Sequence, residues 1–193
     1  MTVSAIVLAG GRAARFDGDK LAAELEGRSV LELAIDAVRG VADEVLVVGR
    51  SGSSSGARYL ADERPFEGPL GGLATGLRAG RGDVALVVGG DMPRLRPGVL
   101  RLLLAQLDAP AATAAALEEG ARPRPLPLAL RRDVAAEVAA ACLVAGERSL
   151  QGFMRRLELR SVPEPEWRAL DPAGETLADV DTRADLDRLR RRR

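Results

Sequence analysis

The fold of this chain is set by its opening residues, Val3-Ser4-Ala5-Ile6-Val7-Leu8-Ala9-Gly10-Gly11. Residues 3–8 are mostly apolar and include β-branched side chains, and a pair of glycines follows shortly after. This pattern predicts a buried strand that feeds a glycine turn. Such a turn lets the backbone approach a ligand and exposes successive amides. The end of this first strand is therefore a candidate anion-binding site.

Strands and helices are expected to alternate along the rest of the chain. The other expected strands are residues 44–48, 58–60 and 84–88, with weaker candidates at 111–117, 126–130 and 159–162. The expected helices are one capped by Ser29 that carries Val30, Leu33, Ala34, Ala37 and Val38, then 70–79, 97–106, 133–145, one from Ser149 through Leu157, and a last one opened by Thr182 and Asp185. This alternation predicts an α/β fold: a Rossmann-like three-layer α/β/α sandwich with a mainly parallel central sheet. Ligands are then expected at the carboxyl ends of the strands.

Length and composition favour a single domain over residues 1–193. The chain has 193 residues, 47% of them apolar, with no internal repeat and no sharp shift in composition. The terminal residues 190–193 are expected to fray. Lys plus Arg and Asp plus Glu both total 28, so charge gives no reason to expect a nucleic acid or a membrane surface as partner.

The sequence is consistent with a protein of the cytoplasm. Its apolar opening is broken at once by Gly10-Gly11, unlike a secretory signal, and no apolar run approaches the roughly 20 residues that cross a bilayer. The single cysteine, Cys142, cannot form an internal disulfide and is expected in the core.

Two absences narrow the chemistry. The chain has no histidine and one cysteine, so a zinc site or a histidine-dependent triad would lack its usual groups. Catalysis must then rest on carboxylates, cations and the backbone.

Lys20 is the only lysine in a chain rich in arginine. Chance would leave an occasional lysine, but the location of Lys20 favours a specific need for an ammonium.

That location is the segment after the first strand, which also holds Arg15. A planar guanidinium and a compact ammonium suit a triphosphate and its departing pyrophosphate, with the amides of Gly10 and Gly11 fixing the phosphates. The dinucleotide fingerprint and the Walker A pattern are both absent. The competing interpretation is a strand end with solvated cations, which the combination of glycines, Arg15 and Lys20 disfavours.

Aspartates supply the candidate metal ligands. Asp91 follows the buried strand at residues 84–88 and two glycines, which places it at the expected ligand edge. An aspartate there can hold Mg²⁺ together with phosphate oxygens, although an Asp near Pro93 also suits a turn. Asp179 and Asp181 alternate along an extended segment before a helix. Asp181 is the preferred second metal ligand, and a helix N-terminus alone would also favour an acid there.

Asp62 precedes Gly68-Pro69-Leu70, a glycine-lined helix start that can accept a flat base edge. A carboxylate accepts hydrogen bonds from the N1 and N2 donors of guanine, whereas cytosine lacks an equivalent pair. Asp62 therefore mildly favours GTP, the alternative being a solvated loop acid.

The residues L-A-G-G, then three residues, Arg, and Asp-Lys resemble the signature of small-molecule nucleotidyltransferases, and within them the molybdenum cofactor guanylyltransferases. Further motifs in family order extend the resemblance over nearly the whole chain: Gly68-Pro69-Leu70, Gly90-Asp91-Met92-Pro93, Ala145-Gly146-Glu147-Arg148 and Asp179-Val180-Asp181-Thr182. The resemblance implies a fold of the nucleotide-diphospho-sugar transferase type. It also implies that GTP contacts Leu8, Ala9, Gly10, Lys20 and Asp62, that Asp91 binds both GTP and Mg²⁺, and that Arg15 is a phosphate ligand.

The chain departs from the family at two places, and it contains no asparagine. The family often has asparagine after its second strand, where this chain has Val48-Gly49, which puts one side-chain contact to the nucleotide in doubt. Asp179 and Asp181 stand where the family has asparagines, which makes this late site more anionic.

The expected reaction is attack by the terminal phosphate of Mo-molybdopterin on the α-phosphorus of GTP, catalysed by Arg15, Lys20 and Asp91. Arg122, Arg124 and Arg148 are weaker candidates for the pterin phosphate, since surface arginines are usually solvated, and Trp167 and Phe153 are expected in the core. Transient contact with cofactor-handling proteins is a further expectation. Three alternatives stay open: a molybdopterin cytidylyltransferase, a guanylyltransferase for phospholactate-type acceptors, and a non-catalytic nucleotide-binding subunit.

Overall fold

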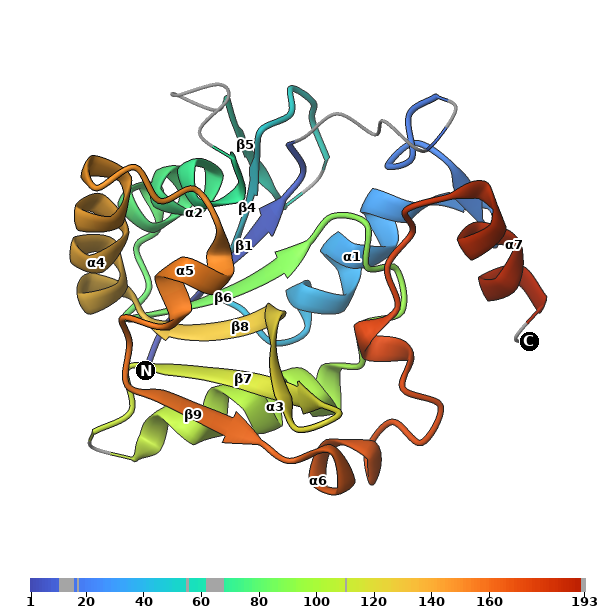
Figure 1. Ribbon diagram of the computed structural model, residues 1–193. Coiled ribbons are helices and arrows are strands. Elements are labelled where there is room, and N and C mark those ends of the chain that lie inside the picture. The colour runs from blue at the N-terminus through green and yellow to red at the C-terminus, as the bar shows by residue number, and fades with distance from the viewer. Residues whose placement is uncertain (11–15, 17, 55, 62–67, 110, 192–193) are drawn as a thin grey trace.

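The computed structural model describes residues 1–10, 16, 18–54, 56–61, 68–109 and 111–191, and its centre is a seven-stranded sheet (Figure 1). The strands of this sheet are β1 (Val3–Leu8), β4 (Glu44–Val48), β5 (Arg58–Leu60), β6 (Val84–Gly89), β7 (Ala114–Glu119), β8 (Arg122–Arg131) and β9 (Leu159–Val162). They lie in the order β5-β4-β1-β6-β8-β7-β9. A separate hairpin joins β2 (Glu24–Leu25) to β3 (Arg28–Ser29).

The sheet is mainly parallel, as expected from the alternation of strands and helices. Four neighbouring pairs are parallel: β5 with β4, β4 with β1, β1 with β6, and β7 with β9. Strand β8 is antiparallel to both of its neighbours, β6 and β7. It follows β7 through a turn in which Gly120 and Ala121 both have positive φ, the geometry of a tight hairpin.

Helices cover both faces of the sheet. They are α1 (Val30–Arg39), α2 (Gly68–Ala79), α3 (Pro97–Ala105), α4 (Arg132–Val144), α5 (Leu150–Met154), α6 (Glu164–Arg168) and α7 (Arg183–Arg191). Helices α1 and α3 pack on one face, and α2, α4 and α5 on the other (Figure 1). Alternate residues of β1 face the two layers, with Val7 in the first core and Ile6 in the second. The predicted three-layer α/β/α sandwich is confirmed.

A third apolar cluster lies apart from the sheet and holds the C-terminal helix. Leu186 and Leu189 of α7 pack against Leu25 of the β2–β3 hairpin and against Phe16. The Arg190 guanidinium also donates to the backbone oxygen of Glu24 at 2.8 Å. These contacts explain why Arg190 and Arg191 are helical, contrary to the expectation of a frayed end at residues 190–193; residues 192–193 lie outside the described part.

Several element boundaries differ from those expected. Helix α1 begins after Ser29, which forms a full capping box with Glu32, but its buried face includes Leu31 and Ile35 in place of Leu33 and Ala37. Helix α5 ends at Met154, before the expected Leu157. The β2–β3 hairpin and α6 were not expected, because elements this short carry too few residues for a periodic pattern.

The side chains of Phe153, Trp167 and Cys142 are fully buried, as expected. Within the described residues, no helix is both long and apolar enough to cross a membrane.

Candidate functional site

Three parallel strands, β4, β1 and β6, end at one edge of the sheet, and Gly10, Gly49 and Gly90 follow them. Leu8 is in register with Val48 on one side and with Gly89 on the other. Hydrogen bonds continue beyond the strands, because the amide of Ala9 donates to Val48 O at 2.8 Å and the amide of Gly90 to Leu8 O at 2.9 Å. The segment from Leu8 to Gly10 is therefore adjacent to the loop that carries Asp91.

Gly10 is in tight backbone contact with Gly49, the residue after β4. A Cβ atom on Gly49 would lie 2.6 Å from Gly10 Cα, and Gly49 has a φ of +89°. A side chain at position 49 would therefore clash and strain the backbone. The close contact with Gly10 therefore requires glycine at position 49 in this chain.

Lys20 lies between two aspartates from distant parts of the chain. Its Nζ is 2.6 Å from Asp91 Oδ2 and 2.9 Å from Asp181 Oδ1. The side chain of Lys20 is 19% exposed and that of Asp91 25%, so this contact is only partly open to solvent. Burial lowers the pKa of Lys20, but the hydrogen bonds and charges of Asp91 and Asp181 outweigh it and hold the pKa above its usual value. The ammonium stays charged at neutral pH.

The acidic segment before α7 is fixed to the loop after β6. Val180 is buried, and its amide donates to the Asp91 carbonyl oxygen at 2.9 Å, while its neighbours Asp179 and Asp181 are exposed. Thr182 and Asp185 then form the reciprocal hydrogen bonds of a capping box at the start of α7, as predicted. Asp179 and Asp181, on either side of the buried Val180, thus lie on the same side of the segment, and Asp181 contacts Lys20.

The surroundings of Asp179 raise the pKa of its carboxyl group. Although its surface is exposed, the protein atoms around it remove enough water to raise its pKa, and the negative charges of Asp181 and Asp91 add to this effect. The Arg124 guanidinium lowers the pKa of Asp179 by a smaller amount. The late acidic segment is therefore electrostatically crowded.

Three of the predicted ligands, Gly11, Arg15 and Asp62, lie outside the described residues. Their assignments as a phosphate-binding glycine, a phosphate ligand and a guanine ligand stay predictions. The structure brings Lys20, Asp91 and Asp181 together with Leu8, Ala9 and Gly10, and the chemical roles of these residues also stay predictions.

A second ion pair lies beside Lys20 and was not expected from the sequence. The Arg50 guanidinium binds Asp19 through two contacts, of 2.9 Å to Oδ1 and 2.5 Å to Oδ2. The hydrogen bond from Arg50 lowers the pKa of Asp19 below its usual value. Both residues are next to residues of the candidate site in the sequence, since Asp19 precedes Lys20 and Arg50 follows Gly49. The position of Arg50 just after a strand was the signal available in the sequence.

Two of the three candidate arginines for a pterin phosphate, Arg124 and Arg148, have protein partners in this structure. Arg148 donates to the backbone oxygens of Leu143 and Glu147, at the C-terminal end of α4. Arg124 Nη1 lies 3.3 Å from Glu119 across the β7–β8 hairpin. Arg124 is the better placed of the two, because its charge acts on Asp179.

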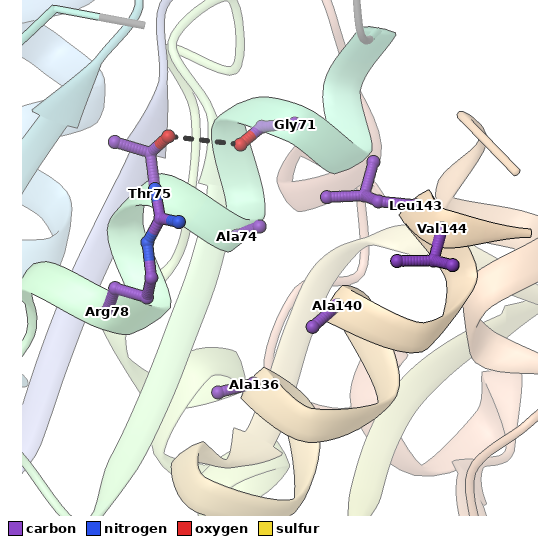
Figure 2. A pocket seen from close by; sticks show the side chains of 8 residues that line it. All are labelled: Gly71, Ala74, Thr75, Arg78, Ala136, Ala140, Leu143 and Val144. Atoms are coloured by element: carbon purple, nitrogen blue, oxygen red, sulfur yellow. Dashed lines mark hydrogen bonds between the residues drawn. The ribbon is translucent and has the colours of Figure 1, made fainter. Parts of the chain in front are cut away.

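A small apolar cavity between α2 and α4 contains none of the predicted site residues (Figure 2). Its volume is about 130 Å³, and small side chains such as Ala74, Ala136 and Ala140 line it. No group of three or more carboxylate, cysteine or histidine side chains that would hold a metal was found in the part of the chain that the structure describes. Within the candidate site, Asp91 and Asp181 both pair with the Lys20 ammonium.

The mainly parallel α/β sheet, with Gly10, Lys20 and two aspartates at its carboxyl edge, fits the class of nucleotidyltransferases. Residues 5–162 match the family model described as the MobA-like NTP transferase domain. The chain belongs to this family.

Relatives and solved structures agree with this assignment. The chain is 36% identical over 194 residues to a Chloroflexus aggregans protein named "Probable molybdenum cofactor guanylyltransferase", with 96% of this chain and 92% of the relative covered. Its fold is similar to that of molybdopterin-guanine dinucleotide biosynthesis protein A from Archaeoglobus fulgidus, with a TM-score of 0.83, 22% identity and 97% of each chain covered. It is also similar to 2-C-methyl-D-erythritol 4-phosphate cytidylyltransferase from Thermus thermophilus, with a TM-score of 0.75, 19% identity, and 99% and 98% covered. The likeness to these two structures concerns the fold alone.

Proposed function

We propose that this protein is a molybdenum cofactor guanylyltransferase, which transfers GMP from GTP to Mo-molybdopterin and releases pyrophosphate. The relative from Chloroflexus aggregans carries this activity in its name, and the resemblance covers nearly the whole of both chains. The observation that carries the proposal is the position of Lys20, whose ammonium lies between Asp91 and Asp181 at the carboxyl edge of the sheet.

Lys20 is the residue that we assign to the leaving pyrophosphate. A lysine ammonium is a compact charge on a flexible stem, so it can leave the two aspartates and follow a phosphate. Stabilising the negative charge that develops on the leaving group lowers the barrier directly. The backbone of Leu8, Ala9 and Gly10 would lie against the nucleotide, with Gly11 and Arg15 as further phosphate ligands.

The two aspartates at Lys20 fit a divalent cation. Mg²⁺ is usually held by one or two carboxylates, with phosphate oxygens and water completing its shell, and Asp91 and Asp181 already converge on one positive charge. Asp91 would be the principal ligand and Asp181 the second. When bound, Mg²⁺ would neutralise charge on the phosphates of GTP.

The reaction exchanges one phosphorus–oxygen bond for another. An oxygen of the terminal phosphate of the acceptor forms a bond to the α-phosphorus, while the bond from the α-phosphorus to the bridging oxygen breaks and pyrophosphate leaves with the electron pair. The acceptor phosphate is already ionised, so no residue has to act as a general base. The protein contributes alignment of the two substrates and positive charge.

Selection of guanine is assigned to Asp62, whose carboxylate would accept from N1 and N2. The proposal rests on the position of Asp62 in the sequence, shortly before the glycine-rich first turns of α2, which begins at Gly68.

The test is pyrophosphate release from GTP or CTP in the presence of Mo-molybdopterin and Mg²⁺. We expect turnover with GTP, and a drop of about 10²-fold or more in Asp91→Asn, because this change removes the principal metal ligand. Arg132→Gln, at the opposite edge of the sheet, serves as the control and is expected to keep its turnover.

The remaining outcomes decide between the alternatives. Turnover with CTP at least equal to that with GTP would make the protein a cytidylyltransferase. Release of pyrophosphate with a phospholactate-type acceptor but not with molybdopterin would change the acceptor. Tight GTP binding without any turnover would indicate a non-catalytic nucleotide-binding subunit.

A further inference from the structure

The two segments that carry Asp91 and Asp181 are joined at a second place, away from Lys20. The first segment, residues 91–96, follows β6, and the second, residues 171–182, runs from α6 past this loop to α7 (Figure 1). The Arg96 amide donates to Thr176 Oγ1 at 3.2 Å, and the Arg96 guanidinium binds the Glu175 carboxylate. Arg96 Nε also lies 4.0 Å from Asp171 Oδ1. We call Arg96, Asp171, Glu175 and Thr176 the clamp.

The acids of the clamp are buried to an extent that is unusual for carboxylates. The side chain of Asp171 is 1% exposed and that of Glu175 is 6% exposed, while Arg96 is 50% exposed. Asp171 Oδ2 also accepts a hydrogen bond of 2.7 Å from the Thr176 amide. Burying a carboxylate costs free energy even when it is paired, and apolar residues often stabilise such a place equally well. We therefore look for a role of the clamp other than stabilising the fold.

The position of the clamp supplies that role. Arg96 lies a few residues after Asp91, and Glu175 a few residues before Asp181. Between the clamp and the site, the Val180 amide donates to the Asp91 carbonyl oxygen at 2.9 Å. The two segments are thus held together at two points, the clamp and the Val180–Asp91 hydrogen bond. Asp181, the residue after Val180, contacts Lys20. Loosening the clamp would let residues 178–181 shift away from Asp91.

We propose that Arg96, Glu175 and Asp171 are positioning residues that keep Asp181 beside Asp91 and thereby set the affinity of the site for a divalent cation. The part of this inference that concerns a metal ion rests on the proposed function. The part that concerns the relative position of the two segments does not. Residues that orient metal ligands from outside typically change metal affinity by 10- to 100-fold when they are mutated.

The experiment compares Arg96→Gln and Glu175→Gln with Arg132→Gln. Arg132 is a matched control, because it is a partly buried arginine that donates to Gly82 O at 2.6 Å and pairs with Asp133 at the opposite edge of the sheet. The first measurement is hydrogen–deuterium exchange of the Val180 amide, which needs neither metal nor substrate. We expect exchange at least about tenfold faster in both clamp variants, and unchanged in the control after correction for global stability.

The second measurement is Mn²⁺ binding to the nucleotide-free protein by electron paramagnetic resonance. We expect the dissociation constant for Mn²⁺ to rise about tenfold in both clamp variants. In turnover assays at saturating Mg²⁺, the KM for GTP is expected to stay within about twofold of the wild-type value, which separates positioning of the metal from loss of nucleotide binding.

The outcomes separate this inference from the proposed function. Unchanged Val180 exchange, unchanged Mn²⁺ affinity, or no Mn²⁺ binding by the wild-type protein would each overturn the inference. If the clamp variants bind Mn²⁺ more weakly and exchange faster, yet wild-type protein transfers no GMP, then the inference stands and the proposed function is wrong.

Discussion

The central parallel strands have clusters of carboxylates at both of their ends, and the two clusters bind different partners. At the amino end, Glu44 Oε1 accepts from Ser4 Oγ at 2.6 Å and from the Arg81 amide at 2.5 Å. Asp83 there accepts from the amide and hydroxyl of Thr2, each at 2.9 Å. At the carboxyl end, Asp91 and Asp181 share the side-chain ammonium of Lys20.

The difference lies in whether the partner can be exchanged without unfolding. Backbone amides such as that of Arg81 are fixed by the fold, so the acids bound to them stabilise the structure. The ammonium of Lys20 is on a flexible side chain and can transfer to another anion. We infer that the amino end of the sheet serves stability and the carboxyl end serves ligand binding.

The largest effect is expected for Lys20→Ala, which tests whether the carboxyl end of the sheet serves ligand binding more than stability. Turnover is expected to fall by about 10²–10³-fold, because the group that we assign to the leaving pyrophosphate is lost. The free energy of unfolding should change by less than about 1 kcal/mol, because the ion pairs are partly exposed. Pyrophosphate release and chemical denaturation measure the two quantities.

Lys20→Arg is the conservative comparison for this variant. It keeps the charge but replaces a compact ammonium with a planar guanidinium, so an intermediate loss of turnover is expected. Turnover of Lys20→Ala within about twofold of the wild type would contradict the role assigned to the lysine.

The second prediction concerns Glu44→Gln at the amino end, where the effect should be on stability and not on turnover. We expect a loss of about 1–2 kcal/mol in the free energy of unfolding at pH 7, because the hydrogen bonds to a charged acceptor are weakened. Burial raises the pKa of Glu44, but hydrogen bonds from Ser4 and from the Arg81 amide outweigh it and hold the pKa below its usual value.

The pH dependence of this variant follows from that lowered pKa. The stability that Glu44 contributes is present above pH 4.5, the usual value, and is lost as the pH falls through the lower folded value. The gap between wild type and Glu44→Gln, measured by denaturation, should therefore narrow below pH 4.5. A large loss of turnover in Glu44→Gln would contradict the inference that the amino end of the sheet serves stability alone.

The smallest effect is expected for Asp179→Asn, which should stabilise the protein. The pKa of Asp179 is raised by loss of hydration and by two neighbouring negative charges, so its ionised form is unfavourable in the folded state. Stability is therefore lost as the pH rises from 3.8, the usual value, through the higher folded value. At pH 7 the asparagine should raise Tm by about 1–3 °C, a gain limited by solvent exposure.

Thermal unfolding of Asp179→Asn across the acid range tests this sign. The gain in Tm should shrink as the pH approaches 3.8, because the wild-type acid becomes neutral there. A lower Tm than wild type at pH 7 would show that Asp179 is paired favourably, and the late segment would then resemble the amino-end cluster.

Much of the sheet was predictable because its strands are short apolar runs between turn residues. The bounds expected for β1, β4, β5 and β9 are those of the structure, and β6 extends one residue further, to Gly89. The hairpin β2–β3 and helix α6 were missed because two to five residues show no periodicity. The buried face of α1 was partly wrong because Leu31, Ala34, Ile35 and Val38 are spaced as regularly as the apolar residues that were chosen, and only packing decides which of the two sets is covered.

The candidate site divides in a similar way. Motifs placed after strands indicated Lys20 and Asp91, because the carboxyl ends of parallel strands meet at one edge. The Asp19–Arg50 pair and the clamp were not predicted. Their members are far apart in the sequence and are surrounded by many other charged residues, so no local pattern distinguishes them from solvated side chains.

The sequence alone established an α/β chain with glycines, one lysine and acids placed after strands, because apolar periodicity and turn chemistry are local properties. Only the tertiary structure decided which charges meet: Lys20 with Asp91 and Asp181, Arg50 with Asp19, and Arg96 with Glu175. The physical reason is that electrostatic interactions depend on distance and burial in space, and neither follows from separation along the chain.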